Sequence, residues 1–133
     1  MDRRLLCMLL AVWLIGCATP GQISRMHRFE QTEKVYRDLI ERSNLEAAGR
    51  FVSKAWRESH PLAPGALRVF HVTDVSIMKM TVSEDNRQVD QTVDIRYFRT
   101  DQMIEKGLRD YQQWQFDEEK KKWVLNTGLP MFE

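Results

Sequence analysis

The hydrophobic period of the chain changes at residues 61–65, and this change restricts the fold more than any other feature. Before it, apolar residues in 22–40 recur three and four positions apart, as on one face of a helix. Pro61, Pro64 and Gly65 then end helical structure. After them, apolar and polar residues alternate, as in half-buried strands. Helices followed by strands predict an α+β fold, in which N-terminal helices pack on a curved antiparallel sheet of about four strands.

A second, shorter helix is predicted after the long one. Ser43 and Glu46 have the spacing of a capping box, in which Ser43 caps the helix and Glu46 bonds back to the Ser43 amide. The strands are predicted at about 67–82, 89–97, 107–116 and 123–125. The first is long enough to be bent or bulged, and both of its faces are partly apolar. The predicted core consists of Tyr36, Leu39, Phe51, Val93, Ile95, Trp114, Phe116 and Trp123.

The first residues of the chain resemble the signal peptide of a bacterial lipoprotein. Arg3 and Arg4 precede an apolar run at 5–15, and Gly16 precedes Cys17, as in a lipobox. The run has eleven residues, whereas a membrane-spanning helix needs about 20. The resemblance implies that residues 1–16 are removed and that Cys17 is acylated. It implies an exported lipoprotein of the cell envelope, held in a membrane by its lipid.

The same reading divides the chain into a signal peptide (1–16), a lipidated tether (17–21) and a single α+β domain (22–133). By resemblance to the sorting rule of enterobacterial lipoproteins, Ala18 favours the outer membrane. Loss of Asp2, Arg3 and Arg4 takes two of the 20 basic and one of the 19 acidic residues, so the mature charges balance. A neutral domain has no basic field that would attract nucleic acid.

The order of elements resembles the cystatin-like cone of the nuclear transport factor two and ketosteroid isomerase superfamily. The segments that carry this resemblance are 36–40 (YRDLI), 111–117 (YQQWQFD) and 122–125 (KWVL). Enzymes of that superfamily place an Asp or His base in a cavity between sheet and helices. By this resemblance, the candidates for a pocket lining are His71, Tyr97, Asp110 and Trp114. None of them matches a family motif residue by residue, so no catalytic role is assigned.

No sequence motif indicates a metal or another cofactor. The three histidines, His27, His60 and His71, do not have the spacing of metal ligands, and no glycine-rich phosphate loop or nucleophile motif occurs. The favoured function is a non-enzymatic envelope module that binds a small apolar ligand or a partner protein. Two alternatives remain open: a pocket enzyme of the isomerase or dehydratase type, and an accessory subunit of an envelope complex.

The outer face of the predicted sheet is a candidate interface. If Val93 and Ile95 face the helices, then Phe98, Tyr111 and Gln113 face away from them. Aromatic residues are enriched at protein interfaces, so this face is predicted to form a homodimer or to bind a partner. The alternative is an ordinary solvated face, because antiparallel sheets can face water on one side.

Overall fold

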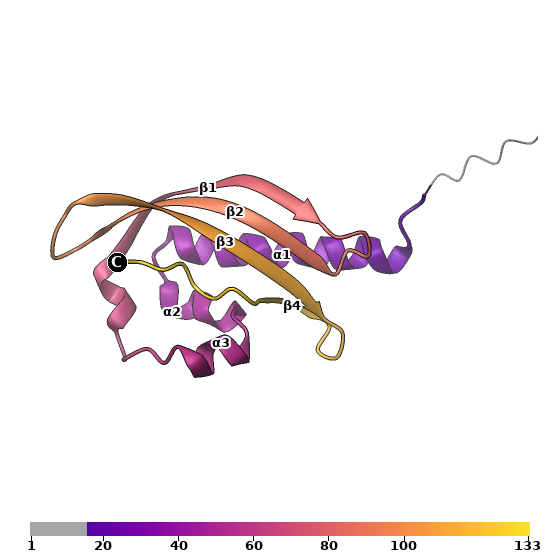
Figure 1. Ribbon diagram of the computed structural model, residues 1–133, viewed down its shortest axis with the longest axis horizontal. Helices are drawn as coiled ribbons and strands as arrows, with labels where there is room; N and C mark the ends of the chain where they lie inside the picture. The colour runs from indigo at the N-terminus through magenta and orange to yellow at the C-terminus, as the bar shows by residue number, and fades with distance from the viewer. Residues whose placement is uncertain (1–15) are drawn as a thin grey trace, which may run out of the picture.

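The structure is a computed structural model, and it describes residues 16–133. The predicted signal peptide, residues 1–16, lies outside the described residues except for Gly16. The described chain is α+β, as the sequence predicts: its N-terminal helices pack against a four-stranded antiparallel sheet of order β1-β2-β3-β4 (Figure 1). The helical elements are α1 (Pro20–Glu41), α2 (Leu45–Ala48), η1 (Gly49–Phe51), α3 (Lys54–Ser59) and η2 (Ala66–Val69). The strands are β1 (Phe70–Val82), β2 (Gln88–Arg99), β3 (Glu105–Asp117) and β4 (Lys122–Leu125).

Helix α1 begins closer to Cys17 than the sequence predicted. Thr19 is its N-cap and forms a capping box with Gln22, and Pro20 occupies a first-turn position where a missing N–H costs little. Only Ala18 therefore separates Cys17 from the capping residue, so the predicted tether of 17–21 is too long. Within residues 16–133, no helix combines the length and the apolar character that crossing a bilayer requires.

The predicted capping box at Ser43 is wrong. Asn44 caps α2 by accepting a hydrogen bond from the Ala47 N–H. Ser43 instead takes a left-handed conformation with φ 60°, and its hydroxyl accepts a bond of 2.8 Å from the Val72 N–H. The side chain that was expected to cap a helix thus joins the α1–α2 turn to strand β1.

Strands β2 and β3 alternate between the core and the outer face, as their sequences predict. Strand β1 pairs with β2 only, and its register shifts twice, between Val72 and Asp74 and between Ile77 and Lys79. Such bulges bend a strand and increase its twist. The prediction that β1 is bent or bulged is confirmed. Its second half does not pack on both faces, however, because Met78 and Met80 are more than half exposed.

The core lies between α1 and the inner face of the sheet. Phe29 and Tyr36 of α1 pack edge-to-face on Trp114, and Phe29 packs in the same way on Trp123. Trp114 is completely buried. Six of the eight predicted core residues are buried, and the two exceptions, Leu39 and Phe51, are only partly buried.

The segment after β4 completes the core, and the sequence did not predict its role. Leu129 is buried, and the ring of Phe132 packs on Phe70 and Tyr97. Gly128 has a φ of 84° and passes directly beneath the Trp56 ring of α3. The C-terminal segment therefore holds the short helices against the end of the sheet.

Candidate functional site

A row of buried polar side chains crosses the inner face of the sheet beneath α1. Gln91 Nε2 donates to Gln112 Oε1 over 3.2 Å, and Gln112 Nε2 donates to Asp110 Oδ2 over 2.9 Å. Trp114 Nε1 donates to the same Gln112 oxygen over 3.1 Å. These bonds satisfy groups that would be costly to bury alone. The Tyr36 hydroxyl is buried as well and has no hydrogen-bond partner within residues 16–133.

Burial raises the pKa of the ionisable side chains in and beside this row. Desolvation raises the pKa of Asp110 from 3.8 to about 6, against the opposing effect of the Gln112 hydrogen bond. Burial also raises the pKa of Tyr36, and the nearby Asp110 carboxyl raises it further. On α1, burial raises the pKa of Glu33, although the Arg37 charge partly offsets that effect. All three shifts favour the neutral form of the side chain.

The space between this row and α1 is too small for a substrate. The hollow between α1 and the sheet, lined by residues that include Glu33, Tyr36 and Gln112, has a volume of about 10 Å³. Such a volume holds one water molecule at most. The pKa of Asp110 is suitable for a general base, but the geometry gives that base nothing to act on.

The structure separates the four predicted pocket residues. Asp110 and Trp114 belong to the buried row, and Tyr97 is buried farther along β2, where its hydroxyl accepts a bond of 3.1 Å from the Glu133 N–H. His71 is exposed and packs on Phe98, with ring centroids 4.9 Å apart, on the opposite face of the sheet. The prediction that His71 lines the pocket is wrong, because the next residue of β1, Val72, faces the core and His71 therefore points the other way.

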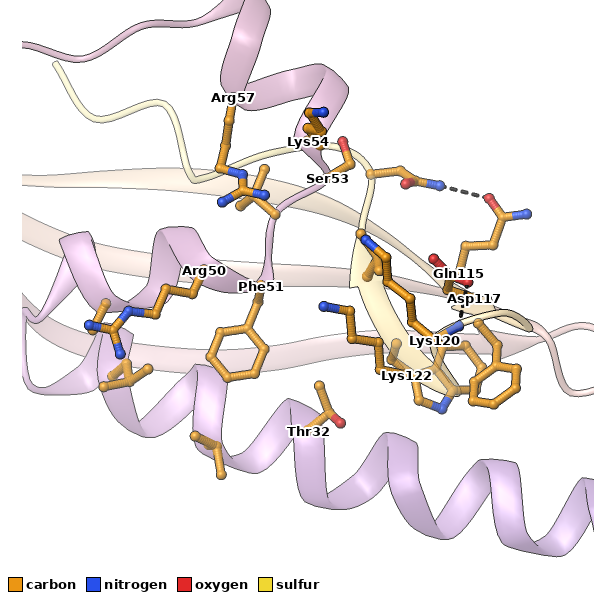
Figure 2. Close-up of a pocket in the computed structure, with 18 residues that line it drawn as sticks. Thr32, Arg50, Phe51, Ser53, Lys54, Arg57, Gln115, Asp117, Lys120 and Lys122 are labelled. Carbon is orange, nitrogen blue, oxygen red and sulfur yellow. Dashed lines mark hydrogen bonds between the residues drawn. The ribbon is translucent and has the colours of Figure 1, made fainter.

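A much larger hollow opens on the other side of α1, and we call it the groove. It has a volume of about 820 Å³ and lies between α1, the η1–α3 segment and strand β4 (Figure 2). Eighteen residues line it: Thr32, Val35, Leu39, Ala47, Arg50, Phe51, Val52, Ser53, Lys54, Arg57, Gln115, Phe116, Asp117, Lys120, Lys122, Trp123, Val124 and Asn126.

Apolar side chains form the α1 side of the groove. Val35 and Leu39 lie one turn apart on α1, and Val35 is 51% exposed. Phe51 packs edge-to-face on Tyr36, which fixes the ring beside them. In Figure 2, Phe51 lies between α1 and Arg57, and Lys122 lies to one side of it. Leu39 and Phe51 are therefore only partly buried because they face the groove.

Basic side chains from other elements line the rest of the groove. They come from η1, α3 and the β3–β4 hairpin: Arg50, Lys54, Arg57, Lys120 and Lys122. Lys54 pairs with Glu58 at 3.6 Å. Within the described part of the chain, the other four have no acidic side chain within 4.0 Å. The groove thus joins an exposed apolar surface to four cations that form no ion pair within residues 16–133.

Asp117 is the single acidic residue of the lining, and its carboxylate already interacts with groups of the hairpin turn. Its Oδ1 accepts hydrogen bonds from the Glu119 and Lys120 N–H groups, at 2.9 and 3.0 Å. These bonds and the charges of Lys120 and Lys122 lower the pKa of the Asp117 carboxyl. Asp117 therefore shapes the hairpin turn and stays ionised there.

A second hollow of about 400 Å³ adjoins the groove, and Arg50 and Arg57 line both. Trp56 and His60 stack there, with ring centroids 4.3 Å apart and an angle of 8° between the rings. The two arginines therefore stand on the ridge between the two hollows.

On the outer face of the sheet, two arginines form ion pairs within the face. Arg109 donates two bonds to Asp94, at 2.8 and 3.1 Å, and Arg96 pairs with Glu105 at 3.3 Å. Of the predicted interface residues, Tyr111 is 67% exposed, whereas Phe98 and Gln113 are partly covered.

Sequence reasoning did not identify the groove. The charged run at 117–122 (DEEKKK) is typical of a solvated hairpin turn, and the cations of η1 and α3 form no recognisable pattern in the sequence. One available signal was Val35, an apolar residue beside the buried stripe of α1 rather than on it.

Comparison of the chain with protein-family models, with curated proteins and with solved structures gave no match. Among residues 16–133, no group of three or more His, Cys, Asp or Glu side chains is arranged to hold a metal ion.

Proposed function

We propose that this chain is a membrane-anchored lipoprotein of the bacterial envelope, acylated at Cys17, whose domain is a non-enzymatic binding module. The groove is its binding site. The observation that carries the proposal is that exposed Val35 lines the same hollow as four cations without an ion pair in residues 16–133, beside the single carboxylate of Asp117. The cations of the lining outnumber its single carboxylate, and an anionic occupant would complement this positive charge.

The buried row supports a binding role rather than catalysis. Its polar groups are held by hydrogen bonds among themselves, and the adjoining hollow of about 10 Å³ leaves no room for a substrate. A pocket enzyme of the isomerase or dehydratase type would need a cavity at Asp110. The groove is the larger and more accessible hollow.

Photocrosslinking in the native membrane tests the binding site. A photoreactive amino acid replaces Val35 in the groove, and in a matched control it replaces Tyr111 on the outer face, because both positions are exposed. We expect adducts with another protein or a small molecule at position 35 alone, whereas position 111 should crosslink only to a second copy of this chain. Adducts with other molecules at position 111 alone would move the site to the outer face, and a lack of such adducts at both positions would contradict a binding role.

The anchor has a separate test. A fatty-acid analogue should label the wild-type protein in cells, and Cys17→Ser should remain unlabelled and leave the membrane fraction. Equal labelling of the two proteins would refute acylation at Cys17 without affecting the groove.

A further inference from the structure

We infer that the occupant of the groove is an acidic amphipathic helix of a partner protein. This inference rests on the proposed function and specifies its partner. Two unlike sets of side chains line the groove: the apolar Val35, Leu39 and Phe51, and the cations of η1, α3 and the β3–β4 hairpin. An occupant that satisfies both sets must be apolar along one face and anionic along another.

The length of the apolar side suits a short helix. Thr32, Val35 and Leu39 occupy positions i, i+3 and i+7 of α1 and all line the groove. Seven residues of helix span about 10 Å, or two turns. A second helix packed along this stripe would place its own apolar residues at the same spacing, which is the pattern of helix-in-groove recognition.

The openness of the apolar side argues against a small ligand. Pockets for small molecules bury about 70–90% of the ligand surface. Val35 is half exposed at the groove, so a small molecule against it would keep one side in water. A helix of a larger partner tolerates this arrangement, because its outward face is polar.

The cations of the groove indicate that the binding surface of the partner is negatively charged. Arg50, Arg57, Lys120 and Lys122 come from separate elements around the groove, and none has an acidic side chain within 4.0 Å in residues 16–133. A single headgroup would neutralise only part of this charge. Several Asp or Glu side chains on one helix face could meet the four cations together.

Fluorescence anisotropy with synthetic peptides tests the inference on the folded domain. The first probe is an 18-residue amphipathic peptide with Leu at helical spacing and Glu on the flanking positions. The second peptide has Lys in place of every Glu, and the third has the composition of the first in scrambled order. We expect the first peptide to bind at least tenfold more tightly than the other two.

A pair of matched double variants locates the binding. Lys120→Glu with Lys122→Glu should weaken binding of the acidic peptide at least tenfold. Lys34→Glu with Lys79→Glu makes the same change of net charge at exposed positions that do not line the groove, and it should have little effect. Equal loss in both variants, or no preference among the three peptides, would overturn the inference.

Competition with laurate separates this inference from the proposed function. If laurate bound at the groove and the acidic peptide did not, the partner class would be wrong, while photocrosslinking at position 35 would still report an occupied groove. If neither peptide nor laurate bound and position 35 gave no adducts, the proposed function would fail as well.

Discussion

Asp110 is the residue whose ionisation most directly affects stability. Burial raises its folded pKa from 3.8 to about 6. The folded state therefore holds the proton more tightly than the unfolded state, and the free energy of unfolding falls as the pH rises from about 4 to about 6. A shift of this size corresponds to about 2–3 kcal/mol.

We therefore predict that Asp110→Asn stabilises the domain by about 1–3 kcal/mol at pH 8 and gives no gain at pH 4. The amide oxygen of Asn can still accept the Gln112 bond. Urea unfolding at the two pH values measures the difference. Asp94→Asn is the control with the opposite sign, because the Arg109 hydrogen bond lowers the pKa of Asp94. A destabilised Asp110→Asn at pH 8 would show that the carboxylate is favourable where it lies.

Gly128 is a position that only glycine can occupy without strain. Its φ is 84°, and an added Cβ would overlap the Trp56 ring. Gly128→Ala should cost about 2–5 kcal/mol, because a left-handed backbone and an overpacked ring both add to the cost. Gly107→Ala is the matched control, since the nearest atom to an added Cβ there, the Ile95 carbonyl oxygen, is 4.0 Å away. Thermal unfolding compares the two variants, and equal melting temperatures would contradict the contact.

For helices and strands, the prediction from sequence was correct where the spacing of apolar residues alone determined the element. Strands β2 and β3 follow the alternation of apolar residues, and α1 follows its stripe. The prediction failed where a contact between residues far apart in the sequence determined the local conformation. Ser43 satisfied the local capping pattern, but its hydroxyl bonds Val72, which lies 29 positions away.

The Ser43 contact gives a prediction at the same scale. Ser43→Ala leaves the Val72 N–H without its acceptor, so unfolding should become easier by about 1–3 kcal/mol. Amide hydrogen exchange should accelerate at Val72 and leave the β2–β3 ladder unchanged. If exchange at Val72 stayed slow, the hydroxyl would not be the acceptor that protects it.

The candidate site was beyond sequence reasoning for a related physical reason. The groove takes its apolar side from α1 and its cations from α3 and the β3–β4 hairpin, which only the fold brings together. The resemblance to cone domains directed attention to the opposite side of α1. There the side chains of Tyr36, Gln91 and Gln112 fill the space that a ligand cavity would need.

For the whole molecule, the outer face of the sheet predicts a homodimer. Tyr111 is exposed there, and the His71–Phe98 pair adds a second aromatic contact. Light scattering of the soluble domain at micromolar concentration should give twice the monomer mass. Phe98→Glu with Tyr111→Glu should give the monomer mass. A monomer in both samples would leave this face to solvent or to a partner.

If Cys17 is acylated as proposed, the capping of α1 at Thr19 limits how far the domain can move from its anchor. With Cys17 acylated as proposed, Ala18 is the single residue between the lipid-bearing residue and the cap. Leu39, at the far end of the groove, lies twenty residues along α1, or about 30 Å from the cap. With so short a tether, the groove can occupy only a thin layer above the bilayer surface. A partner helix held in the same membrane would meet it in two dimensions, at a high effective concentration, whereas one held farther away would be out of reach.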